Sequence, residues 1–167
     1  DDMIMAQESM HERYYFSDAH CRGHYPAYAR KQWAREGTAP EMLPGDEEIL
    51  AGGTVDYIGI SYYMSNCVRS DVEVENAGLS GGNAHTVPNP YVKASEWGWQ
   101  IDPVGLRYSL NALYERYELP IFIVENGFGA IDELKPDHTV DDTYRIDYLK
   151  AHITEMKKAI ELDGVDV

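Results

Sequence analysis

The stretch that most constrains the fold of this chain is Ile121–Gly129, which reads IFIVENGFG. It begins with β-branched and aromatic residues, Pro120 precedes it and two glycines end it, so we predict a short buried strand opening into a loop. Side chains alternate along a strand, so Ile123 and Glu125 share one face. Because an ionised carboxylate is costly in an apolar core, Glu125 indicates either a site at the sheet rim or a strand-end acid held by a cation or backbone amides.

A second strand is predicted over Val55–Tyr63, which is rich in β-branched and aromatic residues and follows two glycines. Alternation places Gly59, Ser61 and Tyr63 on one face of this strand, together with Tyr57. Small residues followed by a tyrosine at the strand exit suit the interior of a tapering barrel.

Helices and one long loop account for most of the remaining chain. Residues 65–98 are rich in glycine and proline with little periodicity, which is typical of a functional or disordered loop. Residues 13–18 are aromatic and are predicted to be irregular. Capping residues, first-turn prolines and terminal glycines predict three helices. These run from Pro26 to about Arg35 before Gly37, from Pro103 to about Glu118 after the cap Asp102, and from Thr143 to about Leu162.

The order of these elements predicts a parallel α/β fold, in which strands alternate with helices. The last helix has an apolar stripe at three- and four-residue spacing, which we expect to be buried. After Gly164, residues 165–167 look like the start of another strand. Because both ends of the sequence fall within or against an element, we expect residues 1–167 to be one incomplete domain. The apolar stripe of the last helix consists of Leu149, Ile153, Met156 and Ile160.

Charge and composition exclude several classes of partner. The formal net charge of −15 argues against nucleic acid or an anionic membrane surface as a partner. No apolar run approaches the roughly 18 residues of a membrane-spanning helix. Cys21 and Cys67 are the only cysteines, in a chain without secretory marks, which favours free thiols in the cytoplasm.

No metal or other cofactor is expected. His20 and His24 have the spacing of helical metal ligands, but the glycine between them favours a structural interpretation. The acidic segment 131–142 lacks the glycine and terminal glutamate of a calcium loop, so we expect it to be solvated, as is the helix face that carries Arg145.

Three motifs in the right order give the chain a family resemblance: VENGFG, DYIGISYYMS and SEWGWQIDPVGLR. Together with YFSDAHCRGHYP and DDTYRIDYLKAHI, they make the whole chain resemble glycoside hydrolase family 1, and within it the bacterial 6-phospho-β-glucosidase branch. The resemblance implies a (β/α)₈ TIM barrel. A complete barrel takes about 250 residues, so this chain would supply the part from after the fifth strand to the start of the eighth.

The resemblance also implies a chemistry and a set of site residues. The family hydrolyses β-glycosides with retention, using one carboxylate as nucleophile and a second as acid/base. Glu125 matches the nucleophile, and Tyr63 matches the tyrosine that hydrogen-bonds to it. Trp99, Ser61 and Asn126 are then expected to contact the substrate, a phosphorylated β-glucoside. For Trp97 we favour a packing role.

Two features separate this chain from a complete member of the family. The Asn-Glu-Pro motif that carries the acid/base is absent, so the chain by itself is expected to be inactive. Ser61 stands where many relatives carry asparagine. The alternatives are a β-glucosidase or 6-phospho-β-galactosidase of the same family, or a non-catalytic sugar-binding half-barrel. Because a half-barrel exposes sheet edges and apolar helix faces, self-association is also expected.

Overall fold

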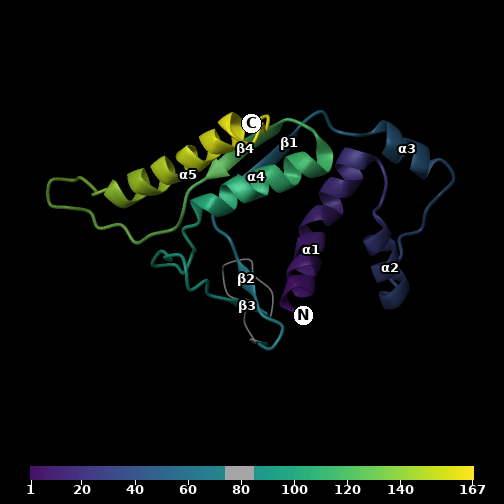
Figure 1. The fold of residues 1–167 in the computed structure, drawn as a ribbon, viewed down its shortest axis with the longest axis horizontal. Coiled ribbons are helices and arrows are strands. Elements are labelled where there is room, and N and C mark those ends of the chain that lie inside the picture. The colour runs from purple at the N-terminus through teal and green to yellow at the C-terminus, as the bar shows by residue number, and fades with distance from the viewer. Residues whose placement is uncertain (74–84) are drawn as a thin grey trace. The chain divides into compact units, whose positions relative to one another are not determined.

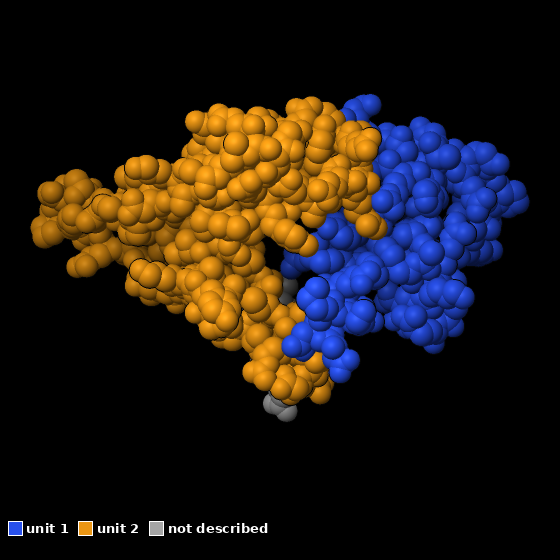
Figure 2. All heavy atoms as spheres, viewed as in Figure 1, with its two compact units in different colours: residues 1–56 blue, residues 57–167 orange. Residues whose placement is uncertain are grey.

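A computed structural model describes residues 1–73 and 85–167. The chain divides into two compact units, residues 1–56 and 57–167, which are coloured separately in Figure 2. Each unit is described by itself below, with the element labels of Figure 1.

The first unit is helical. It consists of α1 (Asp2–Arg22), α2 (Ala27–Glu36) and α3 (Asp46–Gly52). The predicted end of the second helix is confirmed, because Gly37 is left-handed with φ 68° and its N–H donates to the carbonyl of Trp33 at 2.8 Å.

The prediction that residues 13–18 are irregular is wrong, because α1 is continuous through them. Asp18 is fully buried in this helix and accepts a hydrogen bond from the Tyr28 hydroxyl at 2.8 Å. Arg22, one turn further along, lies 3.7 Å from the same carboxylate. Contacts with α2 therefore stabilise a segment that has no clear helical pattern of its own.

The second unit contains the two predicted strands as a parallel pair, β1 (Ile58–Tyr62) and β4 (Ile121–Asn126). The pairing places Ile58 opposite Ile121 and Ser61 opposite Glu125, with an irregularity in the register just before Ser61. Because the strands are parallel, their carboxyl ends meet at one edge of the sheet. Ser61 and Glu125 are neighbours at that edge.

Two helices pack beside this pair of strands, α4 (Pro103–Tyr117) and α5 (Thr143–Glu161), as Figure 1 shows. The start of α4 is as predicted, since the Asp102 carboxylate accepts a hydrogen bond from the N–H of Gly105 at 2.9 Å and Pro103 occupies the first turn. Leu106 and Leu110 from α4 are fully buried. The core consists of Tyr62, Leu106, Leu110, Ile121, Ala159 and Val165.

The predicted buried stripe of α5 is wrong for three of its four residues. Met156 packs against the core, but Leu149, Ile153 and Ile160 are exposed. The helix is turned by about one residue, since the buried positions are Tyr148, His152, Glu155 and Ala159. These four residues also recur at three- and four-residue spacing, and the first two have polar partners within the unit.

Two smaller features complete the second unit, one after α5 and one within the long loop between β1 and α4. The backbone N–H of Ile121 donates to the carbonyl of Asp166 at 2.8 Å and Val165 is buried, but residues 165–167 are not assigned as a strand. Within the long loop, β2 (Cys67–Val68) pairs antiparallel with β3 (Thr86–Val87). The loop prediction for residues 74–84 lies outside the described residues.

Candidate active site

The site lies where β1 and β4 end side by side. The Ser61 hydroxyl donates to Oε2 of Glu125 at 3.0 Å, and the Tyr63 hydroxyl donates a short hydrogen bond to the same oxygen. Strand alternation places Ser61 and Tyr63 on one face at the end of β1, whereas the hydrogen bond from Tyr63 to Glu125 was expected from the family resemblance. The pairing of the strands then brings Glu125 to that face.

These two hydroxyls favour the ionised form of the carboxylate. The hydrogen bond from Tyr63, and to a lesser extent that from Ser61, lowers the pKa of Glu125 below its ordinary value. The same bond raises the pKa of the Tyr63 phenol. Both effects follow because a hydroxyl donor favours the ionised acceptor. Glu125 is exposed at the strand end, and Oε1 accepts no hydrogen bond from the residues that the structure describes. The geometry therefore provides an ionised carboxylate with one oxygen held and the other available.

Two tryptophans extend an aromatic cluster from Tyr63, the residue whose hydroxyl donates to this carboxylate. The ring of Trp99 is 5.5 Å from that of Tyr63, and Trp97 packs edge-on against Trp99 at 5.9 Å. Trp97 also lies against Gly129, because a Cβ atom built on that glycine would overlap the indole. The predicted packing role of Trp97 agrees with this contact only in part, since Trp97 is 57% exposed. Trp99 is partly exposed, and an aromatic ring in this position suits a sugar or aryl ring.

Asn126 has a contact that sequence analysis did not anticipate. Its Nδ2 donates to the carbonyl of Tyr62 at 2.7 Å and to the hydroxyl of Tyr148 at 3.3 Å. Tyr148 in turn donates to the carbonyl of Tyr63 at 2.7 Å. The substrate-binding role of Asn126 stays a prediction, while its amide already joins the ends of the two strands.

Tyr148 is the residue that sequence analysis missed. The available signal was the second stripe of α5, in which Tyr148 and His152 are four residues apart. A pattern of apolar residues at helical spacing selects the stripe that contains Leu149. It does not select Tyr148 and His152, because their side chains also carry hydrogen-bonding groups.

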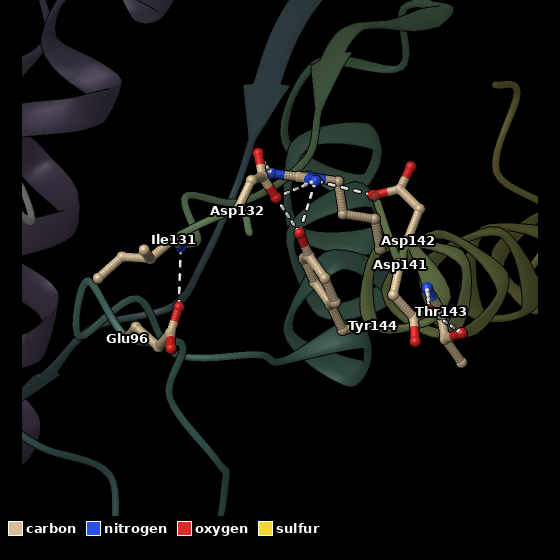
Figure 3. A network of polar contacts seen from close by, with 8 residues as sticks. Glu96, Ile131, Asp132, Asp141, Asp142, Thr143 and Tyr144 are labelled. Carbon is tan, nitrogen blue, oxygen red and sulfur yellow. Dashed lines mark hydrogen bonds and ion pairs between the residues drawn. The ribbon is translucent and has the colours of Figure 1, made fainter. Parts of the chain in front are cut away.

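The loop after β4 is held by a network of polar contacts (Figure 3). Arg145 donates to both carboxylate oxygens of Asp132, at 2.8 and 2.9 Å, and to Asp142 at 2.7 Å, while the Tyr144 hydroxyl donates to Asp132. The acidic loop is exposed to solvent, as expected, but Asp132 and Asp142 also form ion pairs with Arg145, which was not expected. Glu96, beside Trp97, accepts from the N–H of Ile131 at 2.8 Å, which ties the loop to the tryptophan segment.

Two further findings concern the described part of the chain. Residues 1–73 and 85–167 contain no group of three or more His, Cys, Asp or Glu side chains arranged to hold a metal ion. No helix in these ranges is long and apolar enough to cross a membrane.

Comparison with known proteins identifies the family. The model of glycosyl hydrolase family 1 matches residues 1–167. The chain belongs to this family. It is 54% identical over 169 residues to the aryl-phospho-β-D-glucosidase BglA of Bacillus subtilis, with 100% of this chain and 35% of that protein covered. It is 49% identical over 171 residues to a 6-phospho-β-glucosidase of Clostridium longisporum, covering 100% of this chain and 36% of that protein.

The solved structures agree with the predicted fold class. A family 1 β-glucosidase from Thermotoga maritima superimposes with a TM-score of 0.76 at 30% identity, covering 99% of this chain and 36% of that one. The family 1 chain thus forms part of a (β/α)₈ TIM barrel, and it spans about a third of the length of the curated relatives it matches. In such barrels the functional residues lie at the carboxyl ends of the strands, where Glu125 and Ser61 are found.

Proposed function

We propose that the protein to which this chain belongs hydrolyses 6-phospho-β-glucosides with retention of configuration, with Glu125 as the nucleophile. The observation that carries the proposal is the Glu125 carboxylate, whose Oε2 accepts from Ser61 and Tyr63 and whose Oε1 is available. Family membership supports a glycosidase. Two relatives at 54% and 49% identity that are named for phospho-β-glucosides support this substrate class.

In the first step Oε1 of Glu125 attacks the anomeric carbon, and the bond from that carbon to the leaving-group oxygen breaks. A glycosyl ester of Glu125 results, which water hydrolyses in the second step. The nucleophile must be ionised, and the hydroxyls of Tyr63 and Ser61 favour that form. Holding Oε2 also fixes the direction in which Oε1 points.

The proton for the leaving group comes from a second carboxylate about 5–5.5 Å from the nucleophile in retaining enzymes. The Asn-Glu-Pro motif that carries it in the family does not occur in this sequence. We therefore propose that residues 1–167 are an incomplete domain, which supplies the nucleophile and not the acid/base. The chain by itself is then inactive.

For the substrate, we propose that Trp99 provides an aromatic face for the sugar or aglycone and that Ser61 and Asn126 lie within reach of it. The phosphate is recognised by a few local donors elsewhere in the full protein, which a net charge of −15 does not prevent. We also propose a cytoplasmic location. The unpaired state of Cys21 and Cys67 supports it, since a reducing compartment keeps thiols free.

The test uses the full-length protein. It is expected to hydrolyse p-nitrophenyl 6-phospho-β-D-glucoside, and Glu125→Gln is expected to abolish this activity. Labelling with a 2-deoxy-2-fluoro-glucoside 6-phosphate should place the adduct on the peptide that contains Glu125. An adduct on another acid would show that Glu125 is structural. Parallel assays with unphosphorylated and galacto-configured substrates separate a β-glucosidase and a 6-phospho-β-galactosidase from the proposed enzyme.

A second candidate is a non-catalytic sugar-binding half-barrel. The observation in its favour is the absence of the Asn-Glu-Pro motif from this sequence. Sugar binding by the isolated chain, measured by calorimetry, together with no turnover by the full-length protein would support it. Turnover by the full-length protein that depends on Glu125 would exclude it.

A further inference from the structure

The ends of β1 and β4 are joined by a single hydroxyl group from α5. The Tyr148 hydroxyl donates to the carbonyl of Tyr63 at 2.7 Å and accepts from Nδ2 of Asn126 at 3.3 Å. The same Nδ2 donates to the carbonyl of Tyr62 at 2.7 Å. This junction adjoins the candidate site. The Tyr63 hydroxyl donates to Glu125, and Asn126 is the residue directly after Glu125.

The strand pairing does not hold this part of β1 on its own. The register is irregular between Ile60 and Ser61, and Tyr63 lies one residue beyond the last paired position, Tyr62. Within the described residues, the hydrogen bond from Tyr148 is the one that reaches the carbonyl of Tyr63. The Tyr148 side chain on α5 therefore positions the backbone that carries the Tyr63 phenol.

Tyr148 is itself rigidly held. It is buried, its ring stacks on His152 with 3.8 Å between centroids, and Phe128 lies 4.7 Å from it. Nδ1–H of His152 donates to the carbonyl of Tyr148 at 2.8 Å, since a carbonyl oxygen can only accept. Burial raises the pKa of Tyr148 to about 12, so its hydroxyl remains a donor at neutral pH.

We propose that Tyr148 is a positioning residue for the nucleophile: its hydroxyl fixes the Tyr63 backbone and the Asn126 side chain, and so keeps the Tyr63 phenol on Oε2 of Glu125. The inference rests on the proposed function. A hydrogen bond weakens steeply as its geometry departs from linear, so a looser Tyr63 favours the ionised carboxylate less. Among the described residues, the ionisable and charged groups around the junction are Tyr62, Tyr63, Glu125, Tyr148 and His152, with Asp102 at the start of α4 and Arg145 on α5.

The test replaces Tyr148 by phenylalanine in the full-length protein and measures kcat and KM against pH with p-nitrophenyl 6-phospho-β-D-glucoside. Tyr148→Phe keeps the ring and its stacking on His152 and removes only the hydroxyl. The acidic limb of kcat/KM should move up by about half a pH unit, because a weaker donor depresses the pKa of Glu125 less. We expect kcat to fall about three- to tenfold with KM changed less than about twofold.

The matched control is Tyr144→Phe. Tyr144 lies one turn earlier on α5, also contacts Phe128 and also uses its hydroxyl, which donates to Asp132. It has no contact with Tyr63 or Asn126 among the hydrogen bonds of the described residues. Tyr144→Phe should therefore leave the acidic limb in place even if it lowers the melting temperature.

A folded Tyr148→Phe protein with the wild-type acidic limb would overturn the proposal. If that variant does not fold, Asn126→Ala removes the same junction from the β4 side and should move the limb in the same direction. The acidic limb of the pH profile of kcat/KM reports the ionisation of the free enzyme. Loss of a contact between Asn126 and the substrate therefore does not move this limb. An unmoved limb in Asn126→Ala would then overturn the proposal. A wild-type protein that hydrolyses neither phosphorylated nor unphosphorylated glucoside would overturn the proposed function as well.

Discussion

Gly129 lies directly against the indole ring of Trp97. A Cβ atom built on Gly129 would overlap Cε3 of Trp97, so no other residue fits there without a shift. Gly129 belongs to the loop after β4, and Trp97 contacts Trp99, which contacts Tyr63. The glycine thus determines how closely the tryptophan segment approaches the strand that carries Glu125.

Replacing Gly129 by alanine should displace the Trp97 ring. Overpacking of this kind lowers the free energy of unfolding by about 1–3 kcal/mol. In the full-length protein we expect a raised KM and a shifted tryptophan emission maximum, because Trp99 moves with Trp97. Gly127→Ala is the matched control, since a Cβ atom there meets nothing within 4 Å. Equal KM values for the two variants would show that the contact does not influence the site.

The two hydroxyls on Glu125 predict a graded change in pH dependence. The ionised nucleophile is the active form, so activity is lost as the pH falls through its pKa. Tyr63 is the larger cause of the lowered pKa and Ser61 the smaller. Tyr63→Phe should therefore move the acidic limb of kcat/KM to higher pH, and Ser61→Ala should move it less. A larger shift in Ser61→Ala would reverse the assigned order of the two donors.

Part of the arrangement around Glu125 could be predicted from the sequence because it depends on local rules. Alternation along the first strand is sufficient to place Ser61 and Tyr63 on one face, but their contact with Glu125 also requires the pairing of β1 with β4. The start of α4 at Asp102 and Pro103 is equally local, since a capping side chain and a first-turn proline act within one turn.

The features that the sequence did not predict depend on tertiary contacts. The stripe containing Leu149 has the stronger apolar pattern, but α5 buries Tyr148 and His152, which find partners on β1 and within their own helix. Residues 13–18 have little helical pattern, and Asp18 is held there by Tyr28 from another helix. No rule confined to one segment identifies such partners.

An ion pair between α4 and the turn after α5 predicts a change in acid stability. Arg107 donates to both oxygens of Asp163 at 2.6 Å, and Nδ2 of Asn111 donates to Asp163 at 2.8 Å. These donors, Arg107 first, lower the pKa of Asp163 from 3.8 to about 2. A pKa lower in the folded state than in the unfolded state stabilises the fold above about pH 4, and this contribution is lost as the pH falls toward 2.

Asp163→Asn should accordingly flatten the fall in melting temperature between about pH 4 and pH 2 while lowering the melting temperature at pH 7. The measurement is thermal unfolding of the full-length protein by circular dichroism across this range. Asp147→Asn, which removes an exposed carboxylate on α5, serves as the control and should keep the wild-type slope. Identical slopes for both variants would exclude a contribution from the Arg107 pair.

Exposed apolar side chains predict that the 167-residue chain associates when it is produced by itself. Phe122 and Val124 on β4 are 61% and 52% exposed, and Ile153 and Ile160 on α5 are 50% and 40% exposed. Exposed apolar area of this kind favours contact with other molecules. Sedimentation velocity should show species larger than the monomer, and Ile153→Lys should reduce them more than Thr154→Lys, which adds the same charge at the neighbouring exposed position. A wild-type chain that stays monomeric and unfolds in one sharp transition would contradict this expectation.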